Sequence, residues 1–354
     1  MSITLCPAPM RVVTNDTKED AMTTPRRLTL GRLALAIAAC AAAPAALAQQ
    51  PPAAAGKPIF DKPIRLVVPY SPGGGTDILA RHVAERLRQR IGQPVVVDNK
   101  PGANGVIGTD IVAKSPPDGT TVVLVVNTHL LNPLLMKQMP YDTFRDLTPI
   151  TKVATSPMVI VVNADLPAKS VRELNAIMKA APDKVSYGSS ENMTRLVGAM
   201  FVRSQGQPDA VHVPYKGGAP LMADVAAGTT TIGVTSILTA RPFISSGKLR
   251  PIAVTSSKRT DALPGVPTMI EEGARDFETF TDYTLYAPSA TPRPILERLQ
   301  QEIAAVIHTP EMVKILADQA ATPVGASVAE TEAQVKKDAA FWQKAVVDVG
   351  LKPE

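Results

Sequence analysis

The sequence contains few cysteines and lacks the pattern of a nucleic-acid-binding protein. Both cysteines, Cys6 and Cys40, precede residue 49, in a segment that we expect to be removed from the mature chain. Residues 49–354 then offer no disulfide, no thiol nucleophile and no cysteine ligand for a metal. Aromatic residues make up 4% of the chain, and no basic run with interleaved aromatics occurs, which argues against nucleic-acid binding.

Catalytic and metal-binding patterns are absent as well. The four histidines do not have the paired H-E-x-x-H spacing of a zinc site. No serine lies in a G-x-S-x-G motif, so the nucleophile elbow of a hydrolase is not predicted. Acidic residues occur singly and mostly beside basic ones, as is typical of solvated surfaces. We therefore predict a protein that is not an enzyme and that needs no metal and no cofactor.

The start of the chain has the pattern of a cleaved export signal. Two adjacent arginines precede an Ala/Leu-rich run, and small residues follow it. We predict a signal peptide with its upstream extension at 1–48, cleavage after Ala48, and a Pro/Ala-rich tether at 49–58. The apolar run is too short for a membrane span, which needs about 20 residues. We expect the protein in the periplasm; twin-arginine export and lipid attachment at Cys40 are the less favoured alternatives.

Strand-like and helix-like patterns alternate along the rest of the chain. Short runs rich in Val, Leu and Ile predict strands, and apolar residues at i, i+4 spacing, such as Leu79, Val83 and Leu87, predict helices. The predicted strands are 63–70, 94–99, 120–128, 158–164, 185–189, 210–215, 230–236, 250–256 and 277–288. The predicted helices are 76–91, 105–115, 170–181, 194–205, 219–228, 294–308, 310–319 and 327–350. Because strand and helix alternate, the expected fold class is parallel α/β.

Three consecutive glycines separate the first predicted strand from the first predicted helix, in the segment SPGGGTD (residues 71–77). Free backbone N–H groups and the positive end of the helix dipole can face an anion there. The loop lacks the lysine of a P-loop, and Ile78 stands where the dinucleotide fingerprint needs a third glycine. ATP and NAD are therefore not expected, whereas a small carboxylate needs only N–H groups and hydroxyls. The plainer alternative is a tight turn in which Thr76 caps the helix.

Polar residues also stand at the ends of predicted strands. Tyr70 and Ser71 follow the first strand, at the edge where open α/β sheets bind ligands. Thr128 and His129 follow the third strand and are placed to reach the same crevice. Asp77 either caps the helix or meets a ligand ammonium group. These positions favour a binding site over a catalytic one, because they include no nucleophile beside a base.

Several ordered motifs together resemble a known family. They include KPIRLVVPYSPGGGTDILAR, GQPVVVDNKPGANGVIGTDIVAKSPPDGTT, VHVPYKGGAP, LPGVPTMIEEG and the closing WQKAVVDVGLKPE. The chain resembles the periplasmic receptors of tripartite tricarboxylate transporters, also called Bordetella uptake gene (Bug) receptors. The resemblance implies a two-domain periplasmic binding protein of type II, a Venus flytrap in which each domain is a mostly parallel sheet flanked by helices. It also implies membrane transporter subunits as partners.

The resemblance implies that the ligand binds between the two domains. We expect domain 1 to consist of residues 59–160 and 276–354, and domain 2 of residues 161–275. The residues expected to bind the ligand are Tyr70, Ser71, Gly73, Gly74, Thr76, Asp77, Thr128, His129, Ser189, Ser190, Asn192, Thr235 and Ser236. The loop around the three glycines would hold a ligand carboxylate, and the second domain would contact the rest of the ligand.

The sequence departs from the family pattern in the second domain. The family commonly reads Y-G-S-x-G-x-G-S/T at 187–194, but Glu191, Asn192 and Met193 stand in place of the glycines. Thr235 likewise stands where relatives carry Asp, and Tyr283 replaces a usual Trp. The identity of the ligand therefore stays open.

We expect a monomeric periplasmic receptor that captures a small carboxylate by domain closure and delivers it to a membrane transporter. Removal of the leader, with its five basic and three acidic residues, lowers the formal net charge from +5 to +3, a mild surplus that favours an anionic ligand. The alternative is a receptor that presents the bound ligand to a membrane signalling protein without transport.

Overall fold

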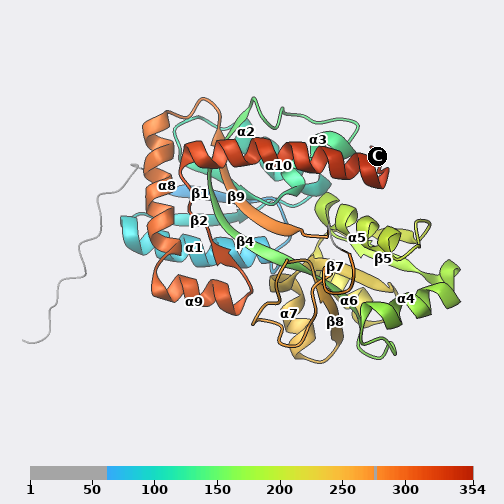
Figure 1. Ribbon diagram of the computed structural model, residues 1–354. Helices are drawn as coiled ribbons and strands as arrows, with labels where there is room; N and C mark the ends of the chain where they lie inside the picture. Colours follow the sequence, from blue (N-terminus) through green and yellow to red (C-terminus); the bar gives the residue numbers. More distant parts are fainter. Residues whose placement is uncertain (1–61, 275–276, 354) are drawn as a thin grey trace, which may run out of the picture. The chain divides into compact units, whose positions relative to one another are not determined.

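The computed structural model describes residues 62–274 and 277–353 (Figure 1). The signal peptide expected at 1–48, with both cysteines, and the tether expected at 49–58 lie outside the described residues. None of the described helices combines the length and the apolar character needed to cross a bilayer.

The first half of the fold is a parallel sheet with helices between its strands. Its elements are β1 (Ile64–Val68), α1 (Gly75–Ile91), β2 (Val95–Asn99), α2 (Val106–Ala113), β3 (Thr121–Val125) and α3 (Thr128–Leu135). β1 pairs in parallel with both β2 and β3. The apolar face of α1, with Leu79, Val83 and Leu87, is buried against this sheet, as its i, i+4 spacing predicts.

The second half repeats this alternation. Its elements are α4 (Val171–Ala180), β5 (Ser186–Ser189), α5 (Asn192–Ser204), β6 (Val211–Pro214), α6 (Gly218–Ala226), β7 (Ile232–Ser236), α7 (Ile237–Ser245) and β8 (Leu249–Val254). β5 pairs in parallel with β6 and β7. The carboxyl ends of the parallel strands in each half therefore carry the loops that lead into helices, the usual place for a ligand site.

Two strands join the halves. β4 (Leu147–Asn163) pairs with β9 (Phe280–Pro288) along residues 147–157, and with β7 and β8 from Met158 onward. The sheet order is β2-β1-β3-β9-β4-β7-β5-β6. All pairings of β4 and β9 are antiparallel. The sheet is thus parallel toward its two ends and antiparallel where the chain passes between the halves.

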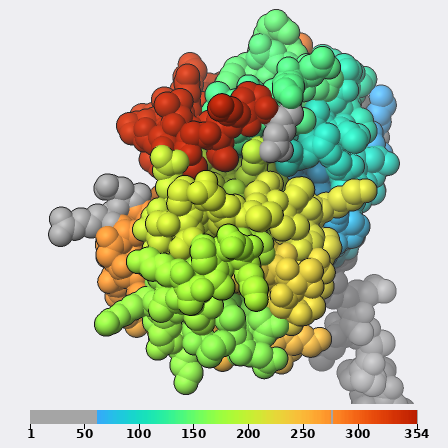
Figure 2. Space-filling view, turned by 90° about the vertical axis from the view of Figure 1, so that its right-hand side faces the viewer, coloured from blue at the N-terminus to red at the C-terminus, as the bar shows by residue number. Residues whose placement is uncertain are grey.

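The chain ends in helices that cover the first half and reach the second. These are α8 (Arg293–Ile307), α9 (Pro310–Asp318) and α10 (Val328–Val349), with the short strand β10 (Thr322–Pro323) between α9 and α10. Ser327 caps α10 in a capping box with Glu330, which agrees with the helix start predicted there. Trp342 of α10 is buried in a core that contains residues from both halves, and the C-terminal residues lie against both in the space-filling view (Figure 2).

Three elements differ from the sequence prediction. The helices α3 and α7 were not predicted because Pro133 and Pro242 interrupt their helical patterns. The strand predicted at 158–164 begins at Leu147 in the structure, since Pro149 and Pro157 hide its first part. Consequently His129, expected in a loop after a strand, lies in the first turn of α3.

Candidate functional site

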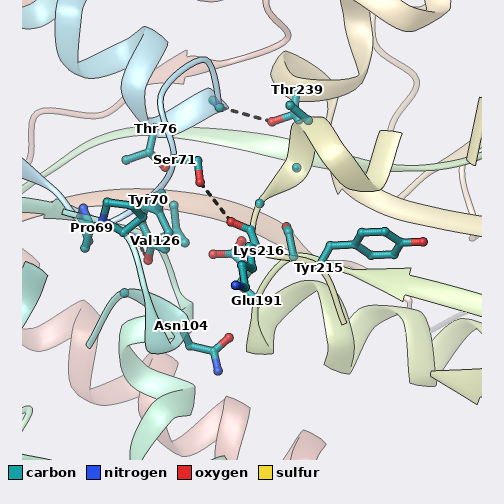
Figure 3. A pocket seen from close by; sticks show the side chains of 18 of the residues that line it. Pro69, Tyr70, Ser71, Thr76, Asn104, Val126, Glu191, Tyr215, Lys216 and Thr239 are labelled. Carbon is teal, nitrogen blue, oxygen red and sulfur yellow. Dashed lines mark hydrogen bonds between the residues drawn. The ribbon is translucent and has the colours of Figure 1, made fainter. Parts of the chain in front are cut away.

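A cavity of 680 Å³ lies where the loops of the two halves meet (Figure 3). Its lining consists of residues 69–72, 74–76, 101–105, Val126, Ser190, Glu191, 214–219, Thr235, Ser236, Thr239, Thr281 and Tyr283. Most of these residues follow the carboxyl ends of β1, β2, β3, β5, β6 and β7. Among the residues that the structure describes, no group of three His, Cys, Asp or Glu side chains is placed to hold a metal ion.

Five of the described α-helices begin at this cavity. Its lining includes the first turns of α1 and α6 and the residues before α2, α5 and α7. Within the described residues, the N–H groups of Thr76, Gly218 and Ala219 have no recorded acceptor. Unsatisfied N–H groups at helix starts, together with the positive ends of the helix dipoles, favour a bound anion. The cavity can therefore hold a carboxylate without an arginine in its lining.

Asp77 holds the glycine loop in place. Its carboxylate accepts hydrogen bonds from Gly73 N (2.9 Å), Arg81 Nε (3.0 Å) and Asn99 Nδ2 (3.0 Å). Burial acts to raise the pKa of Asp77, but the bonds from Arg81, Gly73 and Asn99 hold it below its usual value. Gly73 has a φ of +79°, a conformation that glycine adopts without strain. Loop shape thus depends on Asp77, whose side chain is engaged within its own wall.

The two walls contact each other across the cavity. The Ser71 hydroxyl donates to the carbonyl of Lys216 (3.0 Å), and Gly75 N donates to Thr239 Oγ1 (3.3 Å), as Figure 3 shows. A Cβ atom on Gly75 of the first wall would lie 3.0 Å from Ser236 Oγ of the second. The walls approach this closely because glycine stands at the contact.

Glu191 brings a carboxyl group into the cavity lining. It is the N-cap residue of α5. Burial raises its pKa to about 7, although a hydrogen bond with Thr128 acts in the opposite direction. Tyr283, on β9, lines the same cavity and is 1% exposed, and its hydroxyl has no hydrogen-bond partner among the described residues. Burial raises the pKa of Tyr283, the nearby Ser236 hydroxyl acts in the opposite direction, and the charge of Glu191 adds to the effect of burial.

Residues 79–351 match the family described as the tripartite tricarboxylate transporter family receptor. The chain belongs to this receptor family. A relative, the protein BugT of Bordetella pertussis, is 35% identical over 295 residues, which cover 82% of this chain and 90% of BugT. Its fold and family mark the receptor as a periplasmic solute-binding protein and not an enzyme.

Solved structures of periplasmic binding proteins share the fold. The structure of BugD is 32% identical, with a TM-score of 0.79, and the match covers 83% of the receptor and 100% of BugD. A protein of R. palustris, solved with adipate, is 33% identical with a TM-score of 0.80; the match covers 83% of the receptor and 99% of that chain. The two-domain α/β binding-protein fold expected from the sequence is confirmed.

The receptor brings seven of the predicted ligand-binding residues together in the cavity lining. These are Tyr70, Ser71, Gly74, Thr76, Ser190, Thr235 and Ser236. The other predicted residues, Gly73, Asp77, Thr128, His129, Ser189 and Asn192, lie outside the lining. Ligand contact by any of the thirteen stays a prediction.

Several residues outside the lining support its walls. Thr128 Oγ1 accepts from Met193 N (3.2 Å), and Asn192 Nδ2 donates to Asn132 Oδ1 (3.0 Å), so α3 holds the start of α5. Ser189 Oγ lies 2.7 Å from His212 Nε2. His129 is 2% exposed and packs edge-on against a tyrosine ring, and burial lowers its pKa to about 3.

The lining residues of the receptor that sequence reasoning missed include Gly75, Glu191, Lys216 and Tyr283. Glu191 and Tyr283 were noted as departures from the family pattern, and that is the signal that could have placed them in the site. Lys216 and Gly75 gave no such signal, because they lie within motifs that match the family pattern.

Proposed function

We propose that the protein is a periplasmic receptor that binds a small carboxylate in the cavity between its two domains and delivers it to membrane transporter subunits. The observation that carries the proposal is the convergence of helix starts on one cavity, with free N–H groups at Thr76, Gly218 and Ala219. The relative solved with adipate, at 33% identity, supports a carboxylate as the ligand class.

Domain closure is the mechanism that this geometry favours. Domain 1 would comprise residues 59–160 and 276–354, and domain 2 residues 161–275, so that β4 and β9 run between them. The bonds from Ser71 to Lys216 and from Gly75 to Thr239 join the two walls. A ligand held by both walls binds the closed state better than an open one and shifts the population toward closure. The expected signal peptide would bring the receptor to the periplasm.

Thermal unfolding in the presence of candidate ligands tests this function. The protein is unfolded and refolded to remove any ligand acquired in the cell, and is then screened against monocarboxylates, dicarboxylates, amino acids and uncharged solutes of similar size. A ligand at 100 times its Kd should add about 2.7 kcal/mol to the free energy of unfolding. Stabilisation by uncharged solutes alone, with none by carboxylates, would overturn the proposal.

A substitution at Gly74 tests the location of the site. Gly74 lines the cavity and has backbone torsions open to other residues, with φ −77° and ψ 165°. Gly74→Leu should abolish carboxylate binding because the side chain enters the cavity, while the melting temperature of the ligand-free protein should change little. Unchanged affinity would place the ligand elsewhere. Uptake of the labelled ligand by cells with and without the gene then tests delivery to a transporter.

A further inference from the structure

Glu191 is an unusual group for a carboxylate-binding cavity. Its carboxyl group lies in the lining beside the start of α5, where a helix N-terminus would otherwise receive an anion. No positive charge of the described residues contributes to its pKa, and the side chain that stabilises its charged form is Thr128. The cavity therefore contains a carboxyl group without a cationic partner among the residues that the structure describes.

The other titratable groups of the lining do not neutralise Glu191. They are Tyr70 from the loop after β1, Tyr215 and Lys216 from the loop before α6, and Tyr283 from β9. Glu191 raises the pKa of Tyr70 and of Tyr283 through its charge, after the larger effect of burial. The Lys216 side chain is exposed and forms no ion pair with Glu191 among the described residues. Asp282, next to Tyr283, is paired with Lys152 (2.7 Å).

The cavity lining consequently presents two kinds of polar group. The N–H groups of Thr76, Gly218 and Ala219 suit a carboxylate. The Glu191 carboxyl group and the Tyr283 hydroxyl, which has no hydrogen-bond partner among the described residues, both accept hydrogen bonds. A second ligand carboxylate placed there would meet a like charge, or would require Glu191 to keep its proton.

We propose that Glu191 and Tyr283 form a subsite for a ligand ammonium group, so that the receptor selects an amino carboxylate over a dicarboxylate of the same length. This inference rests on the proposed function, because the carboxylate end of the ligand occupies the N–H groups described above. Glu191 then supplies the negative charge that the ammonium group needs on leaving water.

Calorimetric titration with matched ligands tests the subsite. 4-Aminobutanoate is compared with glutarate, and 5-aminopentanoate with adipate, on the refolded protein at pH near 8. The amino carboxylate of at least one pair should bind at least about 10-fold more tightly. Glu191→Gln retains the shape and removes the charge; it should abolish or reverse this preference. Glu278→Gln, at an exposed glutamate outside the cavity lining, is the matched control and should keep the preference.

The pH dependence separates the subsite from the opposite arrangement. If Glu191 binds an ammonium group, affinity rises from about pH 5 to about pH 8 and binding near pH 6 releases protons. If Glu191 instead donates its proton to a second carboxylate, dicarboxylates bind more tightly and their affinity falls over the same range, which would overturn the subsite. Carboxylate binding with no difference between wild type and Glu191→Gln would also overturn it, and would leave the proposed function intact. Absence of binding by every carboxylate would overturn both.

Discussion

The two walls of the cavity have similar architecture but carry their acidic groups differently. In each wall, a parallel strand leads through a short loop into a helix that begins at the cavity. In the first wall the acid, Asp77, is bonded to Gly73, Arg81 and Asn99 within its own loop. In the second wall the acid, Glu191, lines the cavity, and no cation in the described part of the chain contributes to its pKa.

This difference separates an acid that is paired with an arginine from one that caps α5 and lines the cavity. The bonds to Asp77 keep its pKa low, whereas burial raises that of Glu191 to about 7. The first wall presents the N–H group of Thr76, whereas the second wall presents the N–H groups of Gly218 and Ala219 together with a carboxyl group whose charge depends on pH. We expect the N–H groups of both walls to set the class of anion that the receptor accepts, and Glu191 to set which member of that class binds best.

Replacement of Asp77 should disrupt the glycine loop of the first wall and has the largest expected effect on stability. Asp77→Ala leaves Gly73 N without its acceptor and removes the bonds from Arg81 and Asn99, and it should lower the free energy of unfolding by about 2–4 kcal/mol. Carboxylate affinity should fall with it, because the loop loses its shape. Denaturant titration measures the stability. Asp318→Ala, which removes an exposed pair with Lys314, is the control and should cost below about 0.5 kcal/mol; equal losses in both variants would contradict the role of Asp77.

Replacement of Glu191 should change how the stability of the protein depends on pH. Its folded-state pKa of about 7 lies above the ordinary value of 4.5, so the folded state binds this proton more tightly than the unfolded state. Its contribution to stability is complete below about pH 4.5 and is lost as pH rises to about 7. The ligand-free wild type should lose on the order of 1–3 kcal/mol over this range relative to Glu191→Gln. Parallel stability curves for the two proteins would show that Glu191 titrates normally.

The two walls differ in how far the sequence predicts them. The first wall was predictable because glycines between a strand and a helix have a local physical meaning, and Tyr70, Ser71, Gly74 and Thr76 do line the cavity. The second wall was predictable in position, through Ser190, Thr235 and Ser236, but its chemistry depends on which neighbours surround Glu191. The burial of Glu191, and the lack of a cation beside it within residues 62–274 and 277–353, arise only from the packing of α3, α5 and β9.

The pairing of strands between the two halves also could not be predicted from local sequence patterns. The antiparallel register of β4 with β9 joins residues more than a hundred positions apart, such as Thr155 with Asp282. Proline within β4, α3 and α7 conceals these elements because it disfavours both helix interiors and central strands, and tertiary packing outweighs that local preference here.

Replacement of Ser71 tests the contact between the walls. Ser71→Ala removes the hydrogen bond to the carbonyl of Lys216, which lies near the exposed mouth of the cavity. The closed state should lose about 0.5–1.5 kcal/mol relative to an open one, and ligand affinity should fall by roughly 2–10-fold. Small-angle scattering with and without ligand measures the closure. Ser246→Ala, at an exposed hydroxyl on the far end of α7, should leave affinity unchanged.

Replacement of Tyr283 has the smallest expected effect on stability and bears directly on the second wall. Its buried hydroxyl lies near Ser236 but has no hydrogen-bond partner in the described part of the chain. Since such a group gives up water without compensation, Tyr283→Phe should leave the free energy of unfolding unchanged or raise it by up to about 1 kcal/mol. Amino carboxylate affinity should nevertheless fall by about 3–10-fold, because the phenylalanine offers no acceptor.

The Tyr215 hydroxyl serves as the control, because it has hydrogen-bond partners in the protein. It is bonded to Asp224 (2.9 Å) and Thr230 (2.6 Å), although the residue lines the same cavity. Tyr215→Phe should therefore destabilise the ligand-free protein by about 1 kcal/mol. The two variants distinguish a hydroxyl that binds the ligand from one that stabilises the fold. Tyr283→Phe should lower ligand affinity without lowering the free energy of unfolding, whereas Tyr215→Phe should lower the free energy of unfolding. A loss of stability in Tyr283→Phe with unchanged affinity would assign Tyr283 to the structure of the wall and leave Glu191 alone to recognise the ligand.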